Sequence, residues 1–328
     1  MRMDDAQAQG LAERALEHWG GTQRAPRLVK QRENIVFDAV LRGGTRVALR
    51  LHRPGYQSRA AIDSELWWTS ALAERGLPVA VPVPSLSGAL VEAMDDRAVS
   101  CVGWLEGGPI GSGEAPLAGS ADARAALMRA LGRLIASVQE TTDALSLPAD
   151  FERPAWDIEG LLGEAPRWGR FWENPAFSAA ERGIVEQART LARERLEAYR
   201  ADGADFGLIH ADYVRENVIA GPHGLALIDF DDSGFGFRLY DLGTALTQSL
   251  EEPDLPVLAR SLVAGYRELR ALSDEAEGRL ALFLMLRTFA SAGWVVGRAA
   301  PEDPRQQIFT RRVVRMARHV LAGTTPWD

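Results

Sequence analysis

The sequence is poor in cysteine, in lysine and in long apolar runs. Cys101 is its only cysteine, which excludes an intrachain disulfide and any metal site built from several cysteines, and which fits a reducing cytoplasm. Lys30 is its only lysine, because every other basic residue is an arginine. Apolar runs such as 281–286 are far shorter than the roughly 18 residues of a membrane helix, and the polar residues 1–7 lack the apolar core of a signal peptide. We therefore expect a cytoplasmic protein with no membrane partner.

An excess of positive charge is also missing. The 328 residues carry a formal net charge of −8, whereas nucleic-acid binding needs a basic surface. Hydrophobic residues make up 46% and charged residues 25% of the chain, the usual balance of a folded globular protein. The length predicts one large domain or two modest ones, and no repeat or low-complexity segment interrupts it. We therefore expect no nucleic-acid partner.

The order of the predicted elements indicates a two-lobed α+β fold. The first lobe, 1–104, has the pattern of a small antiparallel sheet with one main helix, and a hinge is expected at about 101–108. The second lobe, 109–328, begins with a stretch rich in Gly, Pro and Ser and is mainly helical. Its predicted helices cover 121–143, 179–202, 254–271, 276–299 and 303–322. Ligands often bind between such lobes, so we expect the functional site there.

Three residues around a predicted β-hairpin carry the strongest chemical signal. Asp212 precedes the first strand, Asn217 begins it, and Asp229 ends the second strand, so the hairpin brings all three to one edge. Two carboxylates and an amide form an oxygen-rich site of the kind that holds Mg²⁺ beside phosphate oxygens. In phosphoryl transfer, one carboxylate orients and deprotonates the attacking hydroxyl, while an asparagine and a second carboxylate hold metal ions. Taken singly, Asp212 or Asp229 is most often a turn or cap residue.

At this point the chain resembles a known family. The motif His210-x-Asp212-x-x-x-x-Asn217, followed by Ile228-Asp-Phe-Asp231, is similar to the aminoglycoside phosphotransferase/choline kinase family, which has a protein-kinase-like fold. The longer strings 228–236 and 239–243 resemble most closely the subgroup of homoserine kinase type II and stress response kinase A. The segments 33–37 and 49–55 match the family's first turn and third strand, and Glu65 matches its position on the first-lobe helix.

The resemblance implies a role for each matching residue around Asp212. Asp212 would be the catalytic base, and Asn217 and Asp229 would be the metal ligands, with ATP and Mg²⁺ as cofactors. His210 would be structural. Asp241, in Tyr-Asp-Leu, would tether the catalytic loop. Asp231 would either support a second metal ion or cap the next turn.

The nucleotide-binding residues depart from the pattern of protein kinases. Arg50 stands where the phosphate-binding lysine is expected, and Lys30, on an earlier strand, is poorly placed to replace it. Arg50 can pair with Glu65 and contact the α- and β-phosphates in a bidentate manner. No Gly-x-Gly-x-x-Gly is present, so the turn 32–34, which includes Asn34, would cover the phosphates with backbone amides. Ala211 replaces the glycine that usually follows the loop histidine.

These observations predict an ATP- and Mg²⁺-dependent phosphotransferase that moves the γ-phosphate to a hydroxyl of a small molecule. The expected acceptor is homoserine-like, amino-alcohol-like or aminoglycoside-like. Two alternatives remain, a Ser/Thr protein kinase of the stress response kinase type and a pseudokinase that binds nucleotide without transfer. The segment 156–172 contains three tryptophans among carboxylates. It either binds a cationic acceptor through cation–π contacts or packs an irregular insertion against the helices.

Overall fold

The computed structural model describes residues 3–31, 34–300 and 302–328 and contains two compact units. Unit 1 comprises Met1–Gly108, Leu145–Arg153 and Ile219–Asp231, and unit 2 comprises Pro109–Ala144, Pro154–Val218 and Asp232–Asp328. The predicted ranges, 1–104 and 109–328, differ from these units because the chain returns to unit 1 twice. The predicted α+β class is confirmed.

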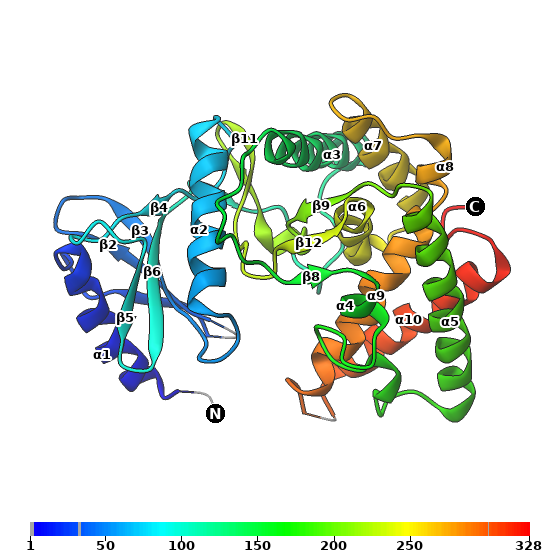
Figure 1. Ribbon diagram of the computed structural model, residues 1–328, viewed down its shortest axis with the longest axis horizontal. Coiled ribbons are helices and arrows are strands. Elements are labelled where there is room, and N and C mark those ends of the chain that lie inside the picture. The colour runs from blue at the N-terminus through cyan, green and yellow to red at the C-terminus, as the bar shows by residue number, and fades with distance from the viewer. Residues whose placement is uncertain (1–2, 32–33, 301) are drawn as a thin grey trace. The chain divides into compact units, whose positions relative to one another are not determined.

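Unit 1 is built on a six-stranded antiparallel sheet (Figure 1). The strand order is β1-β2-β3-β6-β4, and β5 pairs with the first residues of β6, 97–100. The strands are β1 (Arg27–Gln31), β2 (Ile35–Val40), β3 (Arg46–Leu51), β4 (Pro82–Val83), β5 (Val91–Met94) and β6 (Arg97–Gly103). Every second residue of β2 and β3 is apolar and buried, as in a strand with one face in the core. Helix α1 (Asp5–Leu16) covers that face, and Cys101 of β6 lies in the same core.

The opposite face of the sheet carries Arg50 toward helix α2 (Arg59–Glu74). Arg50 lies on the central strand β3, between Val36 of β2 and Ser100 of β6. Helix α2 begins where the Ser58 hydroxyl accepts a hydrogen bond from the Ala61 N–H (2.9 Å), which caps its first turn. The helix brings Glu65 to Arg50.

Two later segments complete unit 1. In segment 145–153, Arg153 donates hydrogen bonds to the carbonyl of Ala61 on α2 (2.9 Å) and to that of Phe230 (3.1 Å). The second segment carries the predicted β-hairpin, β10 (Val218–Gly221) and β11 (Gly224–Leu227). Leu227 forms a parallel bridge with Val79. These bonds attach Asp229 and Asp231 to unit 1, although they lie far along the chain from the sheet.

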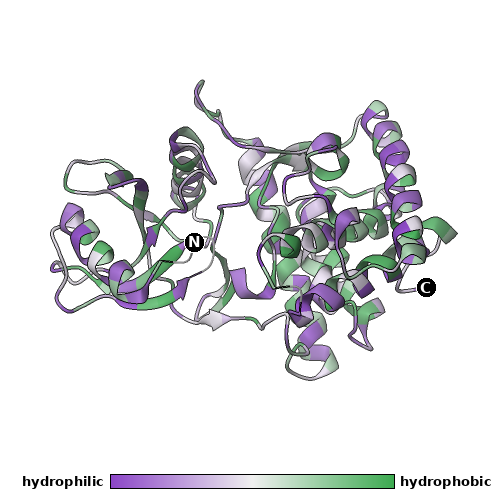
Figure 2. Ribbon diagram, turned by 90° about the horizontal axis from the view of Figure 1, so that it is seen from below, coloured by the Kyte–Doolittle hydropathy of each residue, from purple (hydrophilic) through white to green (hydrophobic). Residues whose placement is uncertain are grey.

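Unit 2 is mainly helical (Figure 1). Its helices are α3 (Ala121–Asp143), α4 (Ile158–Leu162), α5 (Ala179–Ala201), α6 (Leu239–Leu246), α7 (Leu255–Arg267), α8 (Asp274–Glu277), α9 (Leu280–Val296) and α10 (Pro304–Ala322). Helices α3 and α7 approach closely because each offers a glycine to the other. A Cβ at Gly132 would lie 2.0 Å from the Leu262 carbonyl oxygen, and one at Gly265 would lie 1.9 Å from that of Arg129. Figure 2 shows hydrophilic residues concentrated on the outer helices and hydrophobic ones inside.

A small sheet in unit 2, absent from the prediction, positions the catalytic loop. Its order is β8 (Ala155–Trp156), β12 (Gly234–Phe237) and β9 (Phe206–Ile209), with β8 parallel and β9 antiparallel to β12. The short strand β7 (Gly108–Pro109) follows β6. A Cβ at Gly234 would lie 2.2 Å from the Pro154 carbonyl oxygen, so this position needs glycine. The segment after β9 carries His210 and Asp212.

Helix α9 is the core helix of unit 2. The stretch Asp274–Val296 has the length and apolar composition of a helix that could cross a membrane, but 72% of its most apolar window is buried inside the protein. The helix packs against α6 and α10. Burial in this core explains its composition.

Candidate active site

Asp212 is held through both carboxylate oxygens. Its Oδ1 accepts a hydrogen bond from Arg287 Nη2 (2.7 Å), and its Oδ2 accepts one from Asn217 Nδ2 (2.7 Å). Asn217 also donates to the Asp212 carbonyl oxygen (3.0 Å). The Asp212 side chain remains 17% exposed, so an acceptor molecule can reach an oriented carboxylate. This is the arrangement that a general base requires.

The loop that carries Asp212 is fixed by Asp241 of α6. The Asp241 carboxylate accepts hydrogen bonds from the backbone N–H groups of Ala211 (2.8 Å) and His210 (3.3 Å) and from Gln139 (3.1 Å). Complete burial raises the pKa of Asp241 to about 6, and these hydrogen bonds oppose that rise. Asp241 therefore tethers the loop, as the resemblance implied.

Ala211 occupies a backbone conformation that favours glycine. Its φ is +65°, in the left-handed region, which costs a residue with a Cβ about 1–2 kcal/mol. The Ala211 N–H bonds Asp241 and its carbonyl accepts from Arg287 (3.3 Å), and both bonds offset this strain. Within the loop, the Asp212 N–H donates to His210 Nδ1 (3.2 Å), so the histidine is structural. The exchange of glycine for alanine thus falls at a strained position beside the catalytic carboxylate.

Asn217 has the orientation that a metal ligand needs. It lies in a 3-10 turn, Arg215–Asn217, just before β10. Because Nδ2 donates to Asp212, the amide carbonyl oxygen Oδ1 points away from that bond and is the atom that could bind a cation.

Arg287 contacts Asp212 in unit 2 and leads on to Trp168 and Asp232. Sequence reasoning gave neither Arg287 nor Asp232 a role in the site, and it left an acceptor-binding role open for the segment that contains Trp168. Arg287 comes from α9, and its guanidinium lies 4.5 Å from the centre of the Trp168 ring. The Trp168 indole N–H donates to Asp232 Oδ1 (3.2 Å). Arg287 is the only charged residue of the apolar helix Leu280–Val296. A buried arginine in such a helix needs a carboxylate partner, and that signal was available in the sequence.

In unit 1, Arg50 and Glu65 form a buried ion pair, as predicted. Arg50 is 8% exposed, Glu65 is 1% exposed, and Arg50 Nη1 donates to Glu65 Oε1. Burial by itself lowers the pKa of Arg50, but the attraction of Glu65, Asp231 and Asp229 raises it above its ordinary value. Arg50 Nη2 lies 3.5 Å from Asp231 Oδ1 and has no hydrogen-bond acceptor among the described residues. A buried guanidinium with an unused donor suits a phosphate oxygen.

Asp231 completes this charged cluster. It is 5% exposed and accepts a hydrogen bond from Asn34 Nδ2 (3.2 Å). The side-chain carbonyl oxygen Oδ1 of Asn34 in turn accepts a hydrogen bond from the Arg53 N–H (3.0 Å). Asp231 is therefore a buried counter-ion of Arg50. This contact accounts for its burial without the two roles that the resemblance left open, which were support of a second metal ion and a cap of the next turn. Asn34 anchors one end of the predicted phosphate turn, whose other residues, Arg32 and Glu33, lie outside the described residues.

Asp229 lies beside the only lysine. Lys30 Nζ is 3.9 Å from Asp229 Oδ2, and the two side chains are 42% and 35% exposed. Asp229 has a φ of +65°, a strained backbone conformation for a residue with a Cβ. Sequence reasoning set Lys30 aside, and the structure brings it to the candidate metal ligand instead.

The described residues fit a metal ion that takes most of its ligands from phosphate and water. In the ranges 3–31, 34–300 and 302–328, no three His, Cys, Asp or Glu side chains cluster as a closed metal site. Asp229 offers a partly exposed carboxylate and Asn217 an amide oxygen, which are hard oxygen donors. Mg²⁺ beside nucleotide phosphates typically uses one or two such protein ligands.

The tryptophans of the segment 156–172 are buried, and each has an arginine over its ring. The pairs are Arg167 with Trp156 (5.0 Å from the ring centre), Arg287 with Trp168 (4.5 Å) and Arg189 with Trp172 (3.7 Å). Trp156 also stacks on Tyr240 (5.4 Å). The chain's own cations occupy ring faces that an acceptor cation would use, which favours the packing interpretation for Trp156 and Trp172.

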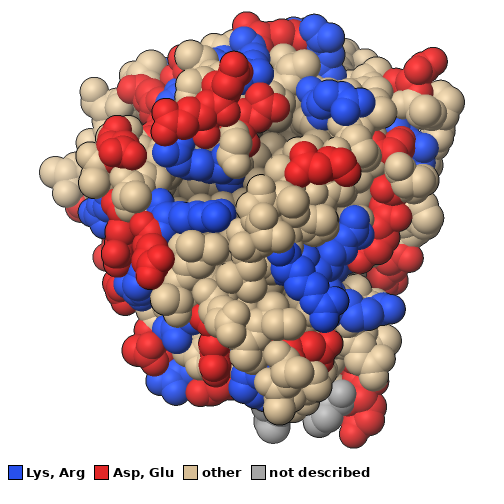
Figure 3. Space-filling view, turned by 90° about the vertical axis from the view of Figure 1, so that its right-hand side faces the viewer, with Lys and Arg blue, Asp and Glu red and all other residues tan. Residues whose placement is uncertain are grey.

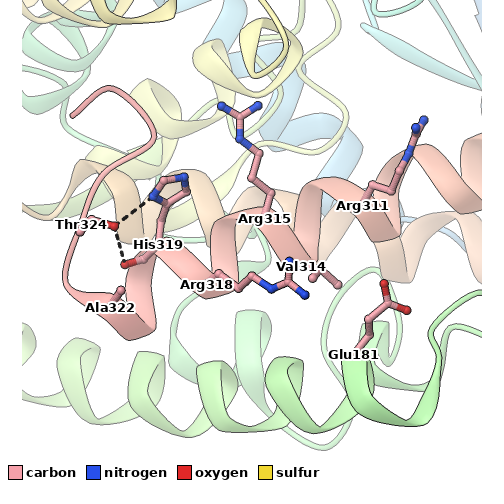
Figure 4. Close-up of a pocket in the computed structure, with 8 residues that line it drawn as sticks. All are labelled: Glu181, Arg311, Val314, Arg315, Arg318, His319, Ala322 and Thr324. Atoms are coloured by element: carbon pink, nitrogen blue, oxygen red, sulfur yellow. Dashed lines mark hydrogen bonds between the residues drawn. The ribbon is translucent and has the colours of Figure 1, made fainter.

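A separate pocket of about 490 Å³ lies between α5 and α10, and Figure 4 shows its lining residues. Glu181 comes from α5, whereas Arg315, Arg318 and His319 come from the last turns of α10. Cations at the carboxyl end of a helix stabilise its exposed carbonyls, and Arg315 also donates to the Leu250 carbonyl (2.6 Å). Figure 3 shows basic side chains beside acidic ones across this side of the molecule. The basic lining therefore has a structural explanation.

Comparison with known proteins identifies the family of the chain. Residues 27–283 match the phosphotransferase enzyme family, and because this is more than half of the chain, the chain belongs to that family. The chain is an ATP-dependent phosphotransferase that acts on an alcohol group. The predicted resemblance and the protein-kinase-like fold are confirmed.

Individual relatives are small-molecule kinases. The solved structure of a microcompartment-associated aminopropanol kinase is 30% identical and aligns with 95% of this chain and 97% of its own, with a TM-score of 0.83. The amicoumacin kinase of Bacillus subtilis is 27% identical over 252 residues, 76% of this chain and 70% of the relative. The homoserine kinase of Rhizobium meliloti is 28% identical over 211 residues, 62% of this chain and 58% of the relative. The match thus spans little more than half of that homoserine kinase.

Proposed function

We propose that the protein transfers the γ-phosphate of ATP, with Mg²⁺, to the hydroxyl of a small amino alcohol. The observation that carries this proposal is the likeness to the aminopropanol kinase, which extends over nearly the whole of both chains. Homoserine, the substrate named for several other relatives, is also an amino alcohol. Aminopropanol and homoserine each carry an ammonium group near the hydroxyl.

The proposed roles divide between the two units. In unit 1, Arg50, oriented by Glu65, contacts the nucleotide phosphates, and Asn34 bonds Asp231, the second carboxylate beside Arg50. In unit 1 Asp229 would offer a carboxylate oxygen to Mg²⁺, and in unit 2 Asn217 would offer an amide oxygen. Mg²⁺ would neutralise charge on the nucleotide phosphates.

Asp212 acts on the acceptor. Its carboxylate orients the acceptor hydroxyl and takes up the hydroxyl proton as the oxygen attacks the γ-phosphorus, and ADP is the leaving group. Arg287 and Asn217 hold this carboxylate from two sides, so the base is positioned before the acceptor binds. Positioning and charge neutralisation then supply the catalysis, with no covalent enzyme intermediate.

The test is ATP-dependent ADP release by wild type and Asp212→Asn across a panel of acceptors. The panel contains 1-amino-2-propanol, homoserine, choline, an aminoglycoside and a generic protein substrate. We expect acceptor-stimulated turnover with an amino alcohol and its loss in the variant. Glu251→Gln, which removes the carboxylate that pairs with Arg312 (2.7 Å), is the matched control and keeps its activity.

Two other results would redirect the proposal. Phosphate on the protein substrate alone would favour the Ser/Thr protein kinase alternative. Thermal stabilisation by ATP and Mg²⁺ without turnover on any acceptor would favour the pseudokinase alternative.

A further inference from the structure

One face of the sheet in unit 1 carries two cations in a single row across the strands. Lys30 of β1 pairs with Val36 of β2, and Val36 pairs with Arg50 of β3. Residues that pair directly across antiparallel strands project from the same face, so Lys30 and Arg50 share the face opposite α1. Two strand spacings separate them, which is roughly 10 Å between their Cα atoms.

Each cation of this row meets one carboxylate of the segment that follows β11. Lys30 Nζ lies 3.9 Å from Asp229 Oδ2, and Arg50 Nη2 lies 3.5 Å from Asp231 Oδ1. The contact between Lys30 and Asp229 is longer than a hydrogen bond, and Arg50 Nη2 has no hydrogen-bond acceptor among the described residues. Neither contact therefore uses the cation as a hydrogen-bond donor, and both donors suit the oxygens of an anionic ligand.

The two cations differ in how firmly they are held. Arg50 is buried, and its Nη1 donates to Glu65, so its guanidinium is fixed inside the protein. The Lys30 side chain is 42% exposed, and its ammonium group is a point charge on a flexible stem. Lys30 can therefore exchange its partner for a negatively charged ligand, whereas Arg50 receives such a ligand in place.

Asp229 locates Lys30 relative to the nucleotide phosphates. Metal ions in phosphotransferases bridge β- and γ-phosphate oxygens, and Asp229 is the candidate metal ligand of unit 1. An ammonium group within 3.9 Å of Asp229 is therefore near the end of the phosphate chain that is transferred. Arg50 lies beside Asp231 instead, one residue farther than the neighbour of Asp229. The row of two cations thus suits a chain of phosphates and not a single one.

We propose that Lys30 is a second phosphate-binding cation, which leaves Asp229 to bind the β- or γ-phosphate of ATP. Arg50 and Lys30 then divide the phosphate chain between a fixed guanidinium and a mobile ammonium group. This assignment rests on the nucleotide site proposed for unit 1 and is independent of which acceptor the enzyme phosphorylates. It gives the only lysine of the chain a role in positioning the group that is transferred.

The first test follows the only lysine by its own chemistry. Acetylation with an N-hydroxysuccinimide ester modifies amines, so the purified chain reacts at Lys30 and at its amino terminus, and peptide mass spectrometry measures the two rates. We expect ATP with Mg²⁺ to slow the acetylation of Lys30 about tenfold, because a phosphate then shields the ammonium group. AMP, which has only the α-phosphate, should leave the rate nearly unchanged. The amino terminus is the internal reference.

The second test measures nucleotide affinity by calorimetry at a fixed, saturating concentration of Mg²⁺. Lys30→Met should raise the Kd for ATP about tenfold or more, the loss of one charge-assisted hydrogen bond, and leave that for AMP within about twofold. Lys30→Arg keeps the charge and should retain most of the affinity. Arg27→Met is the matched control, because Arg27 is another exposed cation of β1 with a carboxylate partner, Asp38 (3.0 Å). It is expected to leave both nucleotides unaffected.

Three results would overturn the assignment while leaving the proposed function intact. These are an acetylation rate of Lys30 that ATP does not change, equal protection by AMP and ATP, and a Kd for ATP that Lys30→Met leaves unchanged or raises only as much as that for AMP. The last result would mean that Lys30 has a structural role alone. Selective protection by ATP in an enzyme that phosphorylates no amino alcohol would instead support the assignment and overturn the proposed acceptor.

Discussion

Replacing Arg287 by methionine tests whether this residue positions the catalytic base. Methionine keeps an apolar contact with the Trp168 ring but removes the bond to Asp212 and the bond to the Ala211 carbonyl. The Asp212 carboxylate then keeps the bond from Asn217 to Oδ2 but loses the bond that orients Oδ1. We expect kcat to fall about 10- to 100-fold, because a misplacement of roughly 1 Å costs about that much. The KM for ATP should change little.

The pH dependence of the reaction separates positioning from simple damage. Removing a positive charge that contacts a carboxylate makes protonation of that carboxylate easier, typically by about 1–3 pH units. The acid limb of the kcat profile should therefore move to higher pH in Arg287→Met. The measurement is kcat for ADP release from pH 5 to 9 with saturating amino alcohol. An unmoved acid limb together with a kcat within a few-fold of wild type would refute the positioning role.

Stability must be measured on the same variant. Breaking a buried ion pair costs roughly 3–5 kcal/mol, and the lower end is expected because Asp212 is 17% exposed and keeps the Asn217 bond. Arg312→Met is the matched control, because it removes another buried arginine of unit 2 whose partner, Glu251, is 57% exposed. Urea unfolding should show a smaller loss for Arg312→Met, and its pH profile should equal that of wild type.

Three further predictions concern the rest of the site. Asp212→Asn should lower kcat at least about 100-fold, while ATP still raises the melting temperature of the variant. The new amide nitrogen faces a donor of Arg287 or Asn217, so the variant should also melt at a lower temperature than wild type. Near-normal turnover would exclude Asp212 as the general base. Glu65→Gln should raise the KM for ATP about tenfold or more and leave that for the acceptor unchanged, because the partner that orients the phosphate-binding arginine loses its charge; equal effects on both constants would contradict this role. Burial raises the pKa of Asp241 to about 6, so its contribution to folding is fully present well below pH 3.8 and is lost as pH rises through 6, by about 3 kcal/mol in total. Between pH 4 and 7 the unfolding free energy of wild type relative to Asp241→Asn should fall by about 2.4 kcal/mol, most of that total. A flat difference would contradict the burial argument.

Local sequence pattern determined most of the secondary structure. Helix α3 has the bounds, 121–143, that its apolar periodicity predicted. The sheet of β8, β9 and β12 was missed because its strands have two to four residues and depend on glycines at 234 and 236. Such strands form only where other segments supply their hydrogen-bond partners. A pattern of two to four residues is too short to predict a strand.

The sequence by itself determined the phosphotransferase class, because the reaction needs a few carboxylate, amide and guanidinium groups at fixed spacings. These groups are Asp212, Asn217, Asp229 and the Arg50–Glu65 pair, and they can be read from short segments of the chain. Only the tertiary structure decided what surrounds them. Arg287 lies 75 positions beyond Asp212, and Asp231 is drawn to Arg50 across the chain, because buried charges must find opposite charges wherever packing places them. The pairing of Trp168 with Asp232 arises in the same way, over 64 positions. Short motifs therefore indicate the reaction class, whereas the partners of the site residues depend on contacts that only the folded chain creates.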